Sequence, residues 1–282
     1  MLFKLFQKRS VTPASSVAST SQVISSTVIA SETGSSITQT PLPTEPSVEK
    51  VIKPVMSTDF IKSIFKSPFE QEEFFQDVYV KSQIYLHHTA GNPNARQCAR
   101  NWNSDDRGRI ATCVVISNTG TKEGKDGEIV QCFSSKNWAY HLGVKSSHFQ
   151  NLNIPYKPLD KTSIGVELCA WGPLTLKNGK FYNYVNGEVP ADQVCELDEP
   201  FRGYKYYHKY SEAQIKSLEN LLRYWGDAYG IPLVYNEDIW NITERAYKLE
   251  PGVYPEHMVY LRSKGICGQS DLVEVVNGKV NI

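Results

Sequence analysis

The organisation of this chain rests on one short segment, Gln83-Ile84-Tyr85-Leu86-His87-His88-Thr89-Ala90-Gly91. Its first part is an apolar run with β-branched and aromatic members, which predicts a strand over residues 83–88. The remainder, ending at Gly91, is typical of a loop. His87 and His88 therefore stand where a strand ends and a loop begins. Neighbouring residues on a strand face opposite ways, so at most one of these histidines points into a site over one face of a sheet.

Other apolar runs that are rich in β-branched residues predict further strands, at residues 111–116, 128–133 and 163–169. The first two flank a Gly-rich turn at residues 120–127, and we expect them to pair as a hairpin. The third is a separate strand.

Helical patterns alternate with these strands. Residues 94–102 follow Pro93, which suits a first turn. A clearer helix begins at Ser211, whose side chain can cap it, and Gln214 completes a capping box. Apolar residues then recur at helical spacing until Gly230 ends the run. Strands that alternate with helices predict an α/β domain around one central sheet.

Composition divides the chain into a tail, a bridge and a globular domain. Residues 1–56 are dominated by Ser, Thr, Val, Ala and Pro, which leaves little to bury and predicts a low-complexity tail. Residues 57–76 carry apolar side chains at roughly helical spacing and predict a bridging segment, either a docking helix or a lid. Residues 77–282 form the globular domain, which is long enough for one core.

Composition also excludes several classes of protein. Basic and acidic residues number 30 each, so a formal net charge of zero argues against a general nucleic-acid binder. No apolar run approaches the roughly 18 residues of a membrane span, and the apolar stretch at the start is too short for a signal peptide. The six cysteines form no CxxC pair and are expected to be mostly reduced, buried thiols.

Polar residues far apart in the sequence suit metal-assisted hydrolysis. His257, Lys264 and Cys267 lie close together in a segment with turn residues and no regular period, which predicts loop-borne functional groups. Two imidazoles and a thiolate would hold a tetrahedral Zn²⁺ with an open position for water. Amide hydrolysis also needs a proton acceptor and an oxyanion donor, roles that suit Glu167 and Lys264. Taken singly, each of these clusters is more typical of ordinary surface or core positions, and only together do they indicate this chemistry.

Motifs in a fixed order resemble one known family. They are Leu86-His87-His88-Thr89-Ala90-Gly91, Trp138-Ala139-Tyr140-His141-Leu142-Gly143, Ser163-Ile164-Gly165-Val166-Glu167-Leu168, and His257 with Lys264. This pattern, over about residues 80–272, is similar to that of the type-2 N-acetylmuramoyl-L-alanine amidases, a superfamily that includes phage lysozyme-type amidases and peptidoglycan recognition proteins. The resemblance implies a single domain with a central mixed β-sheet flanked by helices, and a Zn²⁺ cofactor.

The resemblance also implies the zinc ligands. The first is the His that directly follows the apolar strand, here His87, and the second is His257. In many members the third ligand stands two positions after the catalytic Lys, where this chain has Ile266. Cys267, one position further on, is the expected ligand, and Asp271 is the alternative.

Catalytic and substrate-binding roles follow from the same resemblance. Phage lysozyme-type members use a Tyr base at a position that matches Thr112, which cannot act as a base. Other members use a Glu that matches Glu167, while the catalytic Lys matches Lys264. His141, Trp138 and Thr112 are expected to line the substrate groove, although His141 is also consistent with a role in supporting its loop.

The residues predict metal-assisted amide hydrolysis, and the resemblance implies that the bond is the amide between N-acetylmuramic acid and L-alanine in peptidoglycan. Because no signal peptide is recognised, we expect the protein in the host cytoplasm, with release by lysis, or in a virion. The tail is then expected to dock to a virion or another protein. A non-catalytic peptidoglycan-binding module and a structural virion protein that retains the fold are the alternatives.

Overall fold

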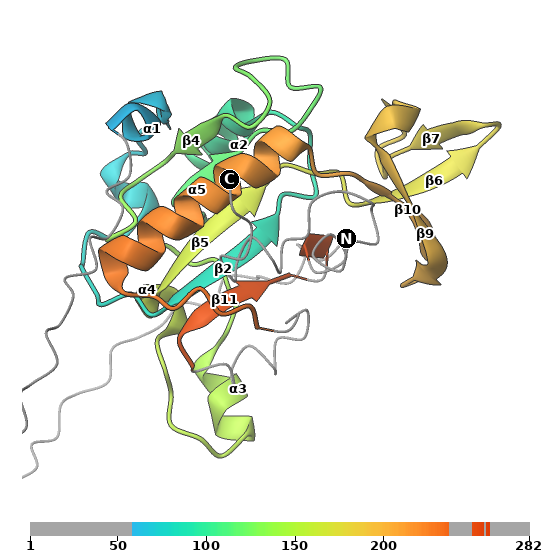
Figure 1. Ribbon diagram of the computed structural model, residues 1–282. Coiled ribbons are helices and arrows are strands. Elements are labelled where there is room, and N and C mark those ends of the chain that lie inside the picture. The colour runs from blue at the N-terminus through green and yellow to red at the C-terminus, as the bar shows by residue number, and fades with distance from the viewer. Residues whose placement is uncertain (1–57, 237–249, 257, 260–282) are drawn as a thin grey trace, which may run out of the picture. The chain divides into compact units, whose positions relative to one another are not determined.

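The computed structural model describes residues 58–236, 250–256 and 258–259, and the predicted tail, residues 1–56, lies outside this range. The described part contains two β-sheets (Figure 1). Its helices are α1 Thr58–Ser63, α2 Ala95–Trp102, α3 Ser146–Asn151, α4 Leu159–Thr162 and α5 Glu212–Tyr229, with short 3-10 turns at Gln71–Glu73 and Ala191–Gln193. None of the described helices is long and apolar enough to cross a bilayer.

The central sheet is mixed and has the order β1-β4-β3-β5-β2-β11. Its strands are β1 Phe65–Lys66, β2 Gln83–His88, β3 Val114–Ile116, β4 Ile129–Gln131, β5 Ser163–Leu168 and β11 Gly252–Pro255. β3 and β4 pair antiparallel, and the other neighbours run parallel. Helix α5 lies across this sheet (Figure 1). The predicted α/β class, a central mixed sheet with helices, is confirmed.

The predicted strands differ in how closely their bounds match. β2 spans the predicted residues 83–88, and the predicted hairpin is present as β3 and β4, but shorter than expected. The Cys113 carbonyl still accepts the Cys132 N–H of the hairpin, but the N–H groups before β3 bond to other segments. The Ala111 N–H donates to the Tyr140 carbonyl, and the Cys113 N–H donates to the Gly165 carbonyl.

Side chains of β2 alternate between two different clusters, as the pleat of a strand requires. Ile84 and Leu86 belong to the main core together with α5 side chains such as Leu218. Tyr85 instead packs in a second cluster that includes Tyr254. His87 shares the alternation of Tyr85, and its ring stacks near the Tyr85 ring with centroids 6.5 Å apart. The strand therefore turns His87 away from the main core.

Helix α5 starts and ends as the sequence predicts. Ser211 Oγ accepts the Gln214 backbone N–H, and Gly230 closes the helix in the left-handed region at φ 66°. The reciprocal half of the capping box is absent, because the Gln214 side chain is fully buried and donates to the carbonyl oxygens of Ile116 and Cys169. Pairing two buried carbonyls of the sheet outweighs a local bond at the helix end.

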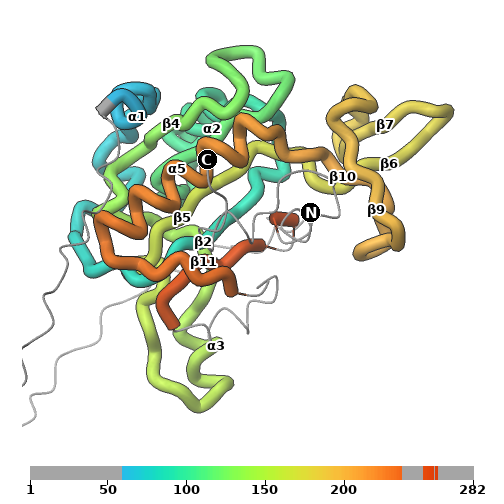
Figure 2. Tube along the Cα trace, in the orientation of Figure 1, coloured from blue at the N-terminus to red at the C-terminus, as the bar shows by residue number. Residues whose placement is uncertain are grey.

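The segment with turn residues that precedes His257 was expected to be a loop, but residues 252–255 of it form strand β11. Gly252–Pro255 is a buried strand that pairs parallel to β2 in continuous register. Figures 1 and 2 show the two strands side by side although they lie far apart in the sequence. Gly252 and Pro255 gave the segment a turn-like composition. Pro is tolerated here because it stands at the end of a short strand.

A second, antiparallel sheet was not predicted. It has the order β8-β7-β6-β10-β9. Its strands are β6 Pro173–Lys177, β7 Lys180–Tyr182, β8 Glu188–Val189, β9 Val194–Phe201 and β10 Tyr204–His208. Most of its outward side chains are polar and exposed, so few apolar positions mark the strands in the sequence.

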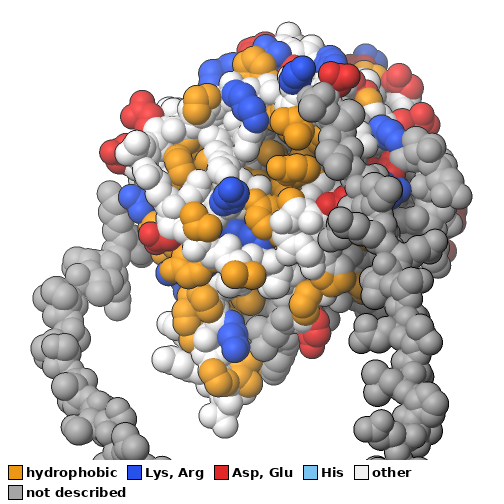
Figure 3. All heavy atoms as spheres, turned by 60° about the vertical axis from the view of Figure 1, so that its left-hand side comes forward, with side chains coloured by type: hydrophobic (Ala, Val, Ile, Leu, Met, Phe, Trp, Pro, Cys, Tyr) orange, Lys and Arg blue, Asp and Glu red, His pale blue; other side chains and the backbone are white. Residues whose placement is uncertain are grey.

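The bridging segment is α-helical only at its start, and a short 3-10 turn, Gln71–Glu73, lies near its end. After α1, strand β1 extends the central sheet beside β4, and Phe75 stacks on Trp138 with ring centroids 3.8 Å apart. Figure 3 brings the α1 side forward and shows hydrophobic side chains interspersed with basic ones. In β1, the Phe65 ring lies against a basic side chain, with the Arg96 guanidinium 3.8 Å from its centroid.

The base of the second sheet contains a buried neutral histidine. His208 is only 5% exposed, and its Nδ1 accepts the backbone N–H of Trp171. Burial lowers the pKa of His208 to about 4 from an ordinary 6.5. Between these two pKa values the unfolded chain binds a proton at His208 and the folded chain does not. The contribution of neutral His208 to the free energy of unfolding is therefore fully present above pH 6.5 and is lost as the pH falls toward 4.

We predict that lowering the pH from 7 to 5 decreases the free energy of unfolding by about 2 kcal/mol through His208 alone. Urea unfolding of the native chain and of His208→Gln at both pH values measures this contribution. The Gln side chain accepts the same N–H and does not titrate, so its pH dependence should be smaller by that amount. Equal pH dependence in the two proteins would contradict the prediction.

Candidate active site

His87 and Glu167 lie in register on neighbouring parallel strands. His87 is the residue before last of β2, and it pairs with Glu167 of β5. Residues in register on parallel strands project to the same face of the sheet, so the imidazole and the carboxylate share one face. His87 is 3% exposed, and the Oε2 atom of Glu167 is shielded from solvent. The predicted first ligand and the predicted base are thus brought together.

Glu256 brings a second carboxylate to His87. It follows β11 directly, and its backbone N–H donates to the Leu86 carbonyl, which continues the register beside β2. Glu256 Oε1 lies 3.0 Å from His87 Nδ1, and Oε2 lies 3.1 Å from His88 Nδ1. Burial opposes ionisation of Glu256, but the two imidazoles outweigh it and hold its pKa well below the ordinary 4.5. The site therefore holds a carboxylate at neutral pH.

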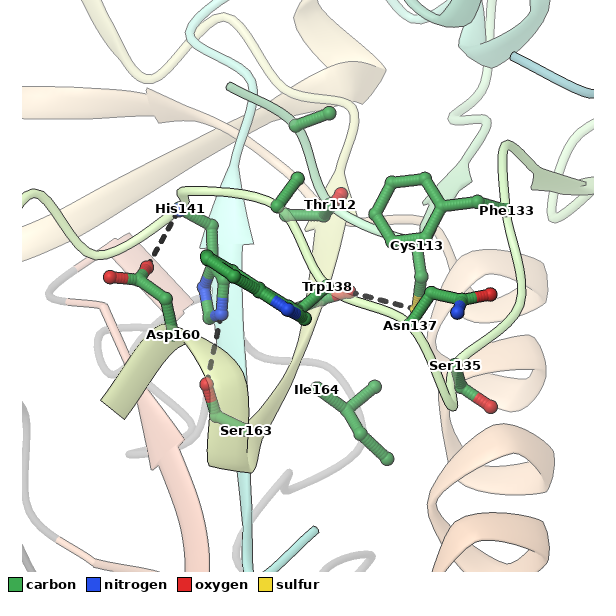
Figure 4. Close-up of a pocket in the computed structure, with 13 residues that line it drawn as sticks. Thr112, Cys113, Phe133, Ser135, Asn137, Trp138, His141, Asp160, Ser163 and Ile164 are labelled. Carbon is green, nitrogen blue, oxygen red and sulfur yellow. Dashed lines mark hydrogen bonds between the residues drawn. The ribbon is translucent and has the colours of Figure 1, made fainter. Parts of the chain in front are cut away.

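His141 contacts the His87 ring at Nε2, whereas Glu256 contacts it at Nδ1. His141 Nδ1 is 3.0 Å from His87 Nε2, and His141 Nε2 is 2.9 Å from Ser163 Oγ. The backbone N–H groups of His141 and Leu142 both donate to Asp160 Oδ1, at 2.8 and 2.9 Å. Figure 4 shows the contacts of His141 with Ser163 and Asp160. Both nitrogens of the His141 ring are therefore turned toward protein groups.

A buried lysine fixes the same loop. Lys81 is 2% exposed, and its ammonium donates to the carbonyl oxygens of Asn137 and Lys161. Burial lowers the pKa of Lys81 to about 8, which still leaves it charged at neutral pH. A charged donor shared between two carbonyls ties the loop before His141 to the start of β5.

The residues predicted to bind substrate line one small pocket. Thr112, Trp138 and His141 all border it, together with Asp160 and Ser163 (Figure 4). Thr112 is 2% exposed and Trp138 is 4% exposed, the latter beneath the ring of Phe75. Thr112 Oγ1 donates to the Val114 carbonyl. In this structure, then, Thr112 and Trp138 form the inner wall of the site and His141 is half-buried among them.

The other predicted site residues, His257, Lys264 and Cys267, lie outside the described residues, as does Asp271. Among the residues that are described, no group of three His, Cys, Asp or Glu side chains is arranged to hold a metal ion. His87 nevertheless has the chemistry of a zinc ligand, because it is a buried imidazole with one nitrogen held by a protein partner. Its other nitrogen faces a carboxylate, which favours a cation there.

The described cysteines are mostly reduced, as predicted. Cys98, Cys113, Cys132 and Cys169 are free thiols, whereas Cys195 takes part in a disulfide. Burial raises the pKa of Cys113 to about 12, and it also raises the pKa of the other three free thiols. Thiols that resist ionisation are poor metal ligands and poor nucleophiles.

Glu256, Ser163 and Asp160 were missed in the sequence. Glu256 could have been found from its place directly after a short apolar run, which is also the place of His87 after β2. Ser163 was recognised only as the start of a strand, and Asp160 gives no signal because its partners are backbone groups of a distant loop.

Several solved structures are similar to this one. PlyL is 13% identical, with 76% of this chain and 96% of PlyL covered and a TM-score of 0.40. The PlyG catalytic domain is 13% identical, with coverage of 77% and 95% and a TM-score of 0.41. The Staphylococcus aureus hydrolase AmiA, solved with its ligand, is 13% identical, with coverage of 77% and 82% and a TM-score of 0.40. No curated protein matches the chain by sequence.

A comparison with models of protein families is more informative, because it covers most of the described chain. The match includes β2, the Trp138–Gly143 motif, β5 and the start of β11, so it spans every described residue of the site except Glu256. The model of the N-acetylmuramoyl-L-alanine amidases matches residues 79–253, and the chain belongs to that family.

Proposed function

We propose that this protein is a zinc-dependent amidase that hydrolyses the bond between N-acetylmuramic acid and the L-alanine of the peptidoglycan stem peptide. The observation that carries the proposal is the register of His87 with Glu167, which sets an imidazole beside a carboxylate on one face of the sheet. The chemistry of His87 fits zinc, and His257 with Cys267 or Asp271 would complete the ligand set.

The chain's own residues supply the remaining chemistry. When bound, zinc acidifies a water molecule and polarises the scissile carbonyl. Glu167 accepts the proton of the attacking water, and Lys264 stabilises the oxyanion of the tetrahedral intermediate. A new C–O bond forms, and Glu167 passes the proton it accepted to the amide nitrogen as the C–N bond breaks, so that the amine leaves in neutral form. The products are a lactyl carboxylate and an alanine with a free amino group.

The third ligand is either Cys267 or Asp271. Both residues lie outside the described part of the chain. Zinc content of Cys267→Ser and of Asp271→Asn therefore identifies the ligand, because the variant that lacks the third ligand should lose zinc.

The place of action is a further part of the proposal. A wall hydrolase of this kind acts on peptidoglycan after release by lysis, or it is carried in a virion with residues 1–56 docked to another protein. Detection of the protein in purified particles supports the second route, whereas detection only in late lysates supports the first.

Digestion of purified cell walls tests the activity. We expect new amino groups on alanine, no new reducing sugar ends, loss of activity with a zinc chelator and recovery when zinc is restored. New reducing ends would instead indicate a glycosidase. Binding to walls without any release of amino groups, by protein that contains zinc or lacks it, would identify a non-catalytic binding module.

A further inference from the structure

The hydrogen bonds behind His87 form a row in which each donor can be assigned. Ser163 Oγ lies 2.6 Å from the Leu159 carbonyl oxygen. A carbonyl oxygen only accepts, so the single hydroxyl proton of Ser163 is donated to it. The same Oγ lies 2.9 Å from His141 Nε2. Because the proton of Ser163 is already used, Ser163 accepts here, and His141 carries a proton on Nε2.

The same reasoning extends to His87. A neutral imidazole has one proton, so His141 with that proton on Nε2 accepts at Nδ1. His141 Nδ1 lies 3.0 Å from His87 Nε2, which makes His87 Nε2 the donor. His87 Nδ1 is then the nitrogen that faces the Glu256 carboxylate, with Oε1 at 3.0 Å. A carboxylate beside Nδ1 favours a positive charge there, either a proton on Nδ1 or a metal ion bound to it.

We propose that Ser163 and His141 are positioning residues that keep the proton of His87 on Nε2, so that Nδ1 is the nitrogen presented to zinc. The inference rests on the proposed function only in taking His87 as a zinc ligand. Imidazole ligands commonly donate their second N–H to a fixed acceptor, which sets the tautomer and the orientation of the ring. Here the acceptor is a second histidine, itself oriented by a serine.

The surroundings hold this row in place. Ser163 is 3% exposed, and two backbone N–H groups bound to Asp160 fix the loop that carries His141. Gly165 of β5 leaves the space that the ring occupies, because a Cβ atom there would lie 2.9 Å from His141 Nδ1. The opposite order of protons would require the Ser163 hydroxyl to turn away from the Leu159 carbonyl.

Nitrogen-15 NMR of the histidine rings in the unaltered protein tests the assignment directly. We expect His87 Nε2 and His141 Nε2 to carry protons both in the metal-free and in the zinc-loaded protein, and we expect zinc to shift His87 Nδ1. A His87 ring without a proton on Nε2, or a zinc-induced shift at Nε2 instead of Nδ1, would overturn the proposal.

Zinc affinity, measured by competition with a chelator, tests the role of each member. We expect Ser163→Ala and His141→Leu to weaken zinc binding by about 10- to 100-fold, the usual effect of losing such a partner. His141→Asn places an amide oxygen where Nδ1 stands and should retain most of the affinity. Ser117→Ala removes an equally buried hydroxyl that accepts the Ala95 N–H, and it should leave the affinity unchanged.

The variants also distinguish this proposal from the proposed function. Native affinity in both Ser163→Ala and His141→Leu, or an Asn variant as weak as the Leu variant, would overturn the positioning role. A zinc-loaded native protein that fails to hydrolyse cell walls would overturn the amidase proposal and leave the NMR and affinity results unaffected.

Discussion

Replacing His87 with Ala is expected to remove zinc binding and wall hydrolysis together. His87 is the predicted ligand at the end of β2, and it is the described residue that connects Glu256 on one side with His141 on the other. Loss of a ligand should weaken zinc affinity by more than the roughly 100-fold caused by loss of a partner of a ligand. Metal analysis and wall digestion on the same preparation provide the measurement.

His148→Ala is the matched control for His87→Ala. This histidine accepts the Lys145 N–H at the start of α3 and has no place in the row of hydrogen bonds behind the site. It should keep native zinc content and native activity. If His87→Ala retained stoichiometric zinc while its fold was intact, the assignment of the first ligand would be wrong.

Glu167→Gln is expected to keep zinc and to lower turnover by roughly 100-fold or more, which is a typical contribution of a general base. The amide has the shape of the carboxylate but cannot accept a proton from water. The register of Glu167 with His87 keeps the altered side chain on the same face of the sheet. Turnover on purified walls at saturating zinc separates this effect from any change in metal content.

Glu219→Gln controls for loss of a buried carboxylate. Glu219 is 3% exposed on α5, where it pairs with Lys216 and Arg223 outside the site. We expect a cost in stability with native turnover per folded molecule. Full activity in Glu167→Gln would show that another group removes the proton.

The elements that could be predicted are those whose signals are local. β2 and α5 could be predicted from the spacing of their own apolar residues and from the residues at their ends. Both lie at the predicted positions. β11 could not be found in this way, since its four residues are held by pairing with a strand that lies far away in the sequence. The weakly apolar strands of the second sheet were missed because their pairing, not their burial, defines them.

The residues of the candidate site also differ in whether a local sequence signal indicates them. His87 and Glu167 could be predicted as site residues because each stands at a recognisable place in a strand, and the structure places them in register. Ser163 and Glu256 acquire a role only through neighbours from other segments, so no pattern within their own segment indicates it. The Gln214 side chain illustrates the reverse case, in which a correct local rule is overruled by two buried carbonyls.

The position of β11 at the edge of the central sheet bears on the order in which the sheet and the site assemble during synthesis. A nascent chain from which residues 250–256 have not yet emerged has β2 as an open edge and lacks Glu256 beside His87. Pairing between such distant segments comes late, because the intervening loop must close first. The edge of β2 therefore stays unpaired, and His87 stays without Glu256, until β11 docks.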